Sequence, residues 1–133
     1  MRLLKILIVG IILIFATISL DFIFFYDPDS ILAITNRKYT LDDYKDVEGY
    51  YSYSIRYIKG EGIGGETIVP ELIKYKIIKE KNKIYAVNGY HDYSKKYIII
   101  NYKKEKHKEY YNLEEMSNND QIIFKTEEGF IYP

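Results

Sequence analysis

The sequence contains no cysteine, and this absence excludes several kinds of chemistry. Disulfide bonds, thiolate metal sites, a cysteine nucleophile and a lipid attached to an N-terminal cysteine all require a thiol. Histidine is nearly as scarce, with 2 residues in a chain of 133. Because a zinc site needs three or four protein ligands, we expect no metal and no cofactor. The usual signatures of catalysis are also missing, which favours a protein that is not an enzyme.

Net charge is absent as well, because 19 Lys and Arg residues balance 19 Asp and Glu residues. Proteins dedicated to nucleic acid are usually strongly basic, so nucleic acid is not an expected partner. The chain is long enough for one small domain, and its hydrophobic content of 47% is ordinary for a protein that folds.

The N-terminus carries the clearest pattern. Arg2 and Lys5 precede a charge-free run over residues 6–20, and aromatic residues follow within 22–26. A spanning helix needs about 17–25 mostly apolar residues, and aromatic rings favour the membrane interface. The pattern predicts a signal-anchor transmembrane helix over residues 1–26. The basic residues place its N-terminus in the cytoplasm, so we expect a single-pass protein of the cell membrane with its C-terminal domain outside the cytoplasm.

A cleaved signal peptide is the alternative interpretation of the same run. Its cleavage site should show small residues in an A-x-A-like pattern, and the nearest match is Thr17-Ile18-Ser19. Whether the N-terminal helix is cleaved stays open at this point. Both interpretations export the rest of the chain.

The remainder divides into a linker over residues 27–46 and an extracytoplasmic β-rich domain over residues 47–133. Thr40 followed by Asp43 resembles a capping box, which predicts a short helical turn at the end of the linker. Residues 51–57 and 72–78 alternate between apolar and polar, as half-buried strands do. Residues 97–100 are apolar without alternation, which is typical of a central strand covered on both faces.

The C-terminal part predicts a helix followed by strands. Asn112 is a possible cap for a short helix that begins at Leu113 and ends by residues 118–120, and residues 121–125 and 130–132 are strand candidates. The expected fold is therefore an N-terminal transmembrane helix plus a small mainly-β (α+β) domain. That domain should be an antiparallel meander of four to six strands with one short helix.

Four short motifs lie within residues 68–116: V-P-x-x-I-x-Y, K-I-Y-A-V, K-Y-I-I-I-N-Y-K-K and Y-Y-N-L-E-E-M. They resemble a family of small membrane-anchored or lipoprotein-like proteins of unknown function from low-GC Gram-positive bacteria. Members of that family pair a V-I-P-x-x-V strand with a Y-x-I-I-D strand and a G-P-L-x-x-E-E-F helix start. This chain has Asn101 in place of the family's Asp, Asn112 in place of its Pro, and no lipid-bearing cysteine. The resemblance implies export and a β-sheet with a helix.

Gly60, Gly62 and Gly65 fit the G-x-G-x-x-G pattern of dinucleotide sites. Such a loop must open a helix, whereas residues 66–70 have the pattern of extended chain. The glycines therefore favour a hairpin loop, and no nucleotide is expected.

Tyrosine is in excess, with 16 residues, and a small domain cannot bury all of them. Tyrosine is favoured at interfaces because it joins a large ring to a polar tip. Tyr90 and Tyr93 flank His91-Asp92 in an expected loop, so Tyr90, His91 and Tyr93 form a possible binding surface. Lysines at 74–83 and 95–108 suggest either a solvated sheet face or contact with anionic polymers.

The sequence thus favours a membrane-anchored, non-catalytic binding or interaction module of the cell envelope. Its partner would be an envelope protein or a wall polymer. The alternative is a small envelope enzyme with a polar site near His91 and Asp92.

Overall fold

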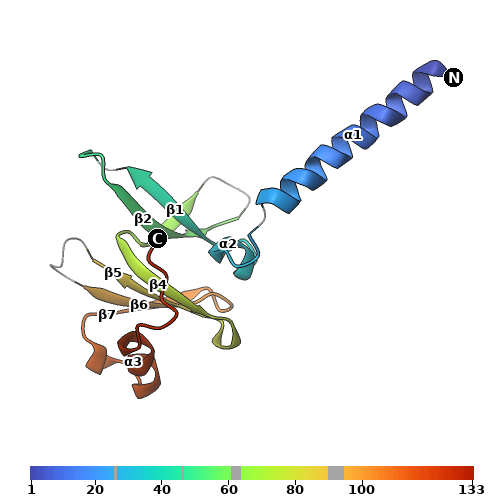
Figure 1. The fold of residues 1–133 in the computed structure, drawn as a ribbon. Coiled ribbons are helices and arrows are strands. Elements are labelled where there is room, and N and C mark those ends of the chain that lie inside the picture. Colours follow the sequence, from blue (N-terminus) through green and yellow to red (C-terminus); the bar gives the residue numbers. More distant parts are fainter. Residues whose placement is uncertain (26, 46, 61–63, 90–94) are drawn as a thin grey trace.

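The computed structural model of the protein describes residues 1–25, 27–45, 47–60, 64–89 and 95–133, and within the first helix the side chains of residues 3–17. That helix, α1 (Arg2–Phe25), projects away from two stacked sheets and a C-terminal helix (Figure 1). The sequence predicted a helix here that spans a membrane. Over the part of the chain that the structure describes, no helix is both long enough and apolar enough for such a span.

The first sheet has three antiparallel strands in the order β1-β2-β3: β1 (Tyr39–Lys45), β2 (Tyr51–Ile58) and β3 (Gly65–Val69). The helical turn expected at Thr40 is wrong, because β1 occupies that part of the expected linker and pairs with β2 along its full length. A local capping signal is worth less than a complete ladder that also buries Tyr39. The face assignment in β2 is confirmed, since Ile55 is fully buried and Tyr53 and Tyr57 pack beside it.

The short helix of the expected linker lies earlier, at α2 (Ile31–Ile34). Ser30 caps it, because the Ser30 hydroxyl accepts a hydrogen bond from the Ala33 backbone N–H at 3.2 Å. Ile31 is buried in the same core as β1, so residues 27–45 contribute side chains to the folded domain.

The second sheet is an antiparallel meander of four strands: β4 (Leu72–Ile78), β5 (Lys83–Asn88), β6 (Lys96–Asn101) and β7 (Lys106–Tyr110). Within the described residues the chain therefore forms seven strands in two sheets, where the sequence predicted four to six strands in one meander. The small α+β class with antiparallel sheets is confirmed. Pro70 separates the two sheets, since a proline cannot donate to a strand ladder and the chain changes sheet between Val69 and Leu72.

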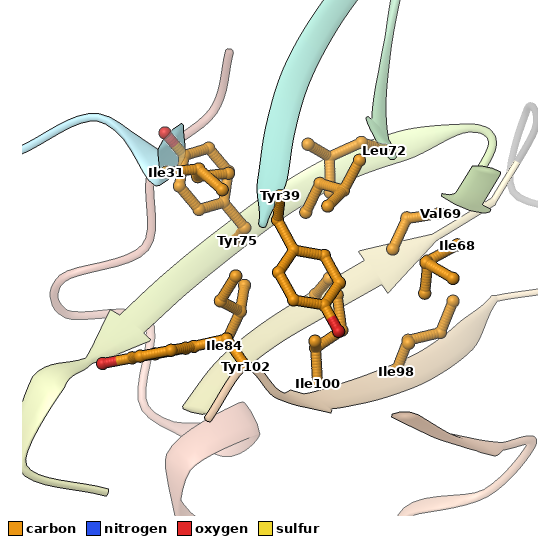
Figure 2. Packing of buried hydrophobic residues seen from close by; sticks show 12 residues of the cluster. Ile31, Tyr39, Ile68, Val69, Leu72, Tyr75, Ile84, Ile98, Ile100 and Tyr102 are labelled. Carbon is orange, nitrogen blue, oxygen red and sulfur yellow. The ribbon is translucent and has the colours of Figure 1, made fainter. Parts of the chain in front are cut away.

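The space between the sheets holds the larger core. Figure 2 shows Tyr39 extending from β1 toward Ile100 on the facing sheet. The remaining buried members of this core are Ile31, Ile55, Ile68, Val69, Leu72, Tyr75, Ile84, Ala86, Ile98 and Tyr102.

The opposite face of the second sheet holds a smaller core, which joins Tyr85, Val87 and Ile99 to Met116 and Phe124. The apolar run in β6 is explained by these two cores. Ile98 and Ile100 belong to one and Ile99 to the other, so the strand is covered on both faces, as its sequence predicted.

A register shift in β4 changes one predicted face. The alternation placed Ile73 on the same face as Tyr75, but the ladder with β5 shifts between Leu72 and Lys74. An irregularity of this kind inverts the alternation beyond it. Leu72 therefore joins the larger core with Tyr75, while Ile73 packs against the smaller one.

The C-terminal elements also differ from the prediction. Residues Leu113–Glu115 form a single 3-10 turn, and the strand expected at 121–125 is instead part of helix α3 (Asn118–Lys125). Ser117 caps α3, accepting a hydrogen bond from the Asp120 backbone N–H at 3.3 Å. The residues taken as the end of one helix are therefore the first turn of another. Near residues 130–132, Ile131 forms one antiparallel bridge with Tyr75 at the edge of β4.

We predict that a fragment of residues 27–133 folds cooperatively, whereas residues 47–133 alone do not. The shorter fragment loses β1 and α2, and with them Tyr39 and Ile31. Removing a large buried side chain costs about 2–5 kcal/mol, and a domain has only about 5–15 kcal/mol of net stability. Far-UV circular dichroism with thermal melting compares the two fragments. Equal melting temperatures would show that β1 and α2 are dispensable.

Candidate functional site

Most of the predicted binding surface cannot be placed, because Tyr90, His91 and Tyr93, like Asp92, lie outside the described residues. The glycine pattern is settled in part. Gly65 opens strand β3, and a Cβ at this position would clash with the Tyr57 carbonyl oxygen. A strand therefore follows the glycines where a dinucleotide site requires a helix. Within the described ranges, no three His, Asp or Glu side chains are grouped so that they could hold a metal ion.

The largest cavity is a cleft of about 880 Å³ on one open side of the sandwich, which we call the α2 cleft. Its walls are β1 with helix α2 on one side and Tyr75 with Ile131 on the other. Ile31 and Tyr75 are buried, whereas Asp27, Asp29, Asn36 and Arg37 are exposed. The full lining is Asp27, Asp29, Ser30, Ile31, Leu32, Ala33, Asn36, Arg37, Thr40, Leu41, Tyr75 and Ile131.

The turn after α2 brings Arg37 to the mouth of this cleft. Asn36 and Arg37 both have left-handed backbone conformations, with φ of 52° and 61°. Such a conformation costs a residue other than glycine about 1–2 kcal/mol. Two helix-ending hydrogen bonds offset this strain, from the Asn36 N–H to the Ala33 carbonyl at 3.2 Å and from the Arg37 N–H to the Leu32 carbonyl at 2.8 Å.

Charges at the mouth are nearly balanced. Asp29 forms an ion pair with Lys79 across the cleft rim at 2.9 Å, and this hydrogen bond raises the pKa of Lys79. The Asp27 carboxylate accepts the Asp29 backbone N–H at 3.0 Å. Among the described side chains, no carboxylate pairs with Arg37. The cleft therefore combines a buried apolar floor with a polar mouth that holds one unpaired guanidinium.

The structure separates buried tyrosines from exposed ones. Tyr39, Tyr75, Tyr85 and Tyr102 are core residues. Four exposed residues gather at the end of the β1–β2 hairpin, and we call them the β1–β2 tip: Tyr44, Val47, Tyr50 and Tyr51. The sequence predicted the surplus of tyrosine, but it assigned the binding surface elsewhere.

Two residues of the tip have defined contacts. The Tyr44 hydroxyl donates to the Glu71 carboxylate at 2.6 Å, and the Lys45 ammonium lies 5.6 Å from the centre of the Tyr51 ring. Tyr50 and Tyr51 nevertheless remain 68% and 65% exposed. Large aromatic area in water at a hairpin end is typical of a contact surface.

Two lysines of β4 bind the C-terminal segment. The Lys74 ammonium donates to both oxygens of Glu127 at 2.6 and 2.7 Å and lies 4.8 Å from the centre of the Phe130 ring. Burial acts to lower the pKa of Lys74, but Glu127 and Tyr132 outweigh it and raise the pKa. The Lys76 ammonium donates to the Glu128 carbonyl at 2.7 Å. These lysines therefore hold the chain end against the sheet and are not part of an open basic face.

Polar contacts also join the two sheets to each other. Glu105, in the β6–β7 turn, accepts a hydrogen bond from the Tyr57 hydroxyl at 3.2 Å and pairs with Lys38 at 3.4 Å. Burial, with Tyr57 and Glu105 nearby, raises the pKa of Tyr39 to about 12. Tyr39 therefore stays neutral at physiological pH.

Asp120 fastens α3 to the second sheet. Its carboxylate accepts hydrogen bonds from the fully buried Tyr85 at 2.7 Å and from Ser117 at 2.8 Å, and Lys83 lies 3.5 Å away. Burial acts to raise the pKa of Asp120, but these three partners outweigh it and hold the pKa below its usual range. The same contact, together with burial, raises the pKa of the Tyr85 hydroxyl. The arrangement is structural, because it ties a helix to a strand.

No protein-family model matches the chain, and no curated protein or solved structure was found to match it.

We predict that Asp120→Asn lowers the free energy of unfolding by about 1–3 kcal/mol at neutral pH, the scale for hydrogen bonds to a charged group. A depressed folded-state pKa stabilises the protein above the unfolded value of about 3.9, and this contribution is lost as the pH falls through the folded-state pKa. The difference between wild type and variant should therefore shrink in acid.

Urea unfolding of residues 27–133 at neutral pH and near pH 3 measures this difference. Glu128→Gln, at an exposed position, is the control and should change little at either pH. A difference for Asp120→Asn that is the same at both pH values would show that its charge contributes nothing.

Proposed function

We propose that this protein is a non-catalytic binding module of the cell envelope, held at the membrane by α1 with its sheet domain outside the cytoplasm. The observation that carries the proposal is the contrast between a helix whose apolar side chains are all exposed and a domain that closes its own core. The domain would contact an envelope protein or a wall polymer through the β1–β2 tip.

The surface of α1 supports a membrane location. Apolar side chains cover it on every side, because residues at consecutive positions are spaced by about 100° around a helix. Each costs about 1.5–3 kcal/mol when exposed to water instead of buried. The exposed apolar residues are Leu3, Leu4, Ile6, Leu7, Ile8, Val9, Ile11, Ile12, Leu13, Ile14 and Phe15. In the sequence the charge-free run continues to residue 20, and Arg2 and Lys5 lie at its start.

The position of the β1–β2 tip supports a binding role. In Figure 1 the end of the β1–β2 hairpin and α1 point in different directions from the domain. A membrane that surrounds α1 would therefore leave the tip in water, facing the envelope. Buried aromatic anchors dominate the affinity of most interfaces, whereas exposed lysines mainly affect association rate and salt dependence.

We predict that changing Tyr50 and Tyr51 together to Ala weakens capture of the envelope partner by about 1–3 kcal/mol, the scale for losing an aromatic anchor. Both rings are exposed, so the melting temperature should stay nearly unchanged. The measurement is recovery from envelope extract with the solubilised full-length chain as bait. Tyr111→Ala, at an equally exposed tyrosine outside the tip, is the matched control.

A second pair of changes separates aromatic from electrostatic binding. Reversing Lys104 and Lys106 to Glu should weaken capture only at low salt, because exposed charges are screened at physiological salt. If the lysine pair abolishes capture at physiological salt while the tyrosine pair is silent, the partner is an anionic polymer bound by charge and the tip is not the anchor.

A further inference from the structure

We propose that the α2 cleft binds one acyl chain of a membrane phospholipid, with the lipid phosphate at Arg37. This inference rests on the proposed membrane location of α1. It adds a ligand and a binding site that are separate from the β1–β2 tip.

Chain connectivity brings the cleft to the lipid. α1 ends at Phe25, and the lining of the cleft begins at Asp27. In Figure 1, α2 lies directly below the domain-proximal end of α1. A bilayer that surrounds α1 must therefore end within a few ångströms of the cleft mouth. Lipid is the apolar ligand present there at the highest local concentration.

The shape and polarity of the cleft fit an amphiphile. Its volume of about 880 Å³ lies in the usual range for sites that enclose a small organic ligand. Ile31 and Tyr75 form a buried floor, and Leu32, Ala33 and Leu41 are only partly covered. An acyl chain needs apolar contact without hydrogen bonds, and side chains of this kind provide it.

The mouth of the cleft fits a phosphate. Arg37 is exposed there in a left-handed conformation, and among the described residues no carboxylate pairs with it. Guanidinium groups bind phosphate through paired charge-assisted hydrogen bonds. Asp29, the acidic residue that would otherwise oppose an anion, is already paired with Lys79. A free strand from a second copy is the competing occupant, since β1 is the edge of its sheet.

The experiment uses the full-length chain in phosphatidylglycerol vesicles that contain a small fraction of the same lipid with a diazirine at the end of one acyl chain. After irradiation the protein is cleaved before aspartate, which separates α1 from the peptide of residues 29–41. Mass spectrometry then quantifies lipid adducts on each part. The variants are Ala33→Trp, which fills the cleft, and Ala33→Leu, which fills it less. Ile122→Trp is the control, at an exposed position of α3 on the other side of the second sheet.

We expect adducts on both α1 and residues 29–41 of the wild type. Adducts on 29–41 should fall by roughly tenfold in Ala33→Trp, a loss equal to 1.4 kcal/mol of binding, and by less in Ala33→Leu. Those on α1 should not change, and Ile122→Trp should match the wild type. Arg37→Gln should reduce adducts on 29–41 with phosphatidylglycerol but not with an uncharged diacylglycerol probe.

Four results would overturn the inference. Adducts confined to α1 would show an empty cleft and leave the proposed function intact, whereas adducts on neither part would overturn both. Adducts on 29–41 that persist in a folded Ala33→Trp variant would place the lipid outside the cleft. Protein–protein products at 29–41 in place of lipid adducts would assign the cleft to a second copy.

Discussion

Ile98, Ile99 and Ile100 place apolar side chains on both faces of the second sheet, and the rest of the domain depends on covering them. Each buried isoleucine contributes about 1.5–3 kcal/mol, so leaving either face in water would use up much of the 5–15 kcal/mol that keeps a domain folded. The first sheet with α2 covers one face, and the 3-10 turn with α3 covers the other. Each cover is then fixed by polar contacts, from Glu105 to Tyr57 and from Asp120 to Tyr85.

This construction leaves two surfaces that the core does not use. The three-stranded sheet is fixed at Pro70, where the chain changes sheet, and its far hairpin end extends beyond the second sheet as the β1–β2 tip (Figure 1). The edges of β1 and β4 leave the α2 cleft between them, closed at its floor by Ile31 and Tyr75. One surface lies beside α1 and the other away from it. A lipid-facing site and a partner-facing site would thus occupy different parts of one small domain.

The sequence predicted elements well where one local pattern dominated. The alternation of β2 and the isoleucine run of β6 identified the strands and their covered faces correctly. It failed where a short local signal competed with tertiary contacts. The capping pattern at Thr40 was overridden by pairing with β2, and residues 121–125 became helical because Ser117 starts α3.

The sites were harder to predict than the strands, because they depend on which residues the core leaves over. Tyr39 and Tyr51 look alike in sequence, yet one is buried between sheets and the other is exposed at a hairpin end. The α2 cleft joins residues near position 30 to Tyr75 and Ile131, and no sequence spacing marks that grouping. The pair Asn36-Arg37 after a short helix was the one local signal of the turn that forms the cleft mouth.

The most direct test of the membrane-held arrangement uses the absence of cysteine, since one introduced cysteine gives a single labelling site. Nitroxide labels at Leu7→Cys in α1 and at Val47→Cys in the β1–β2 tip are compared in vesicles for their relaxation by oxygen, which concentrates in lipid, and by a water-soluble nickel chelate. The account predicts that oxygen dominates at position 7 and the nickel chelate at position 47. Equal relaxation by the nickel chelate at both positions would contradict it.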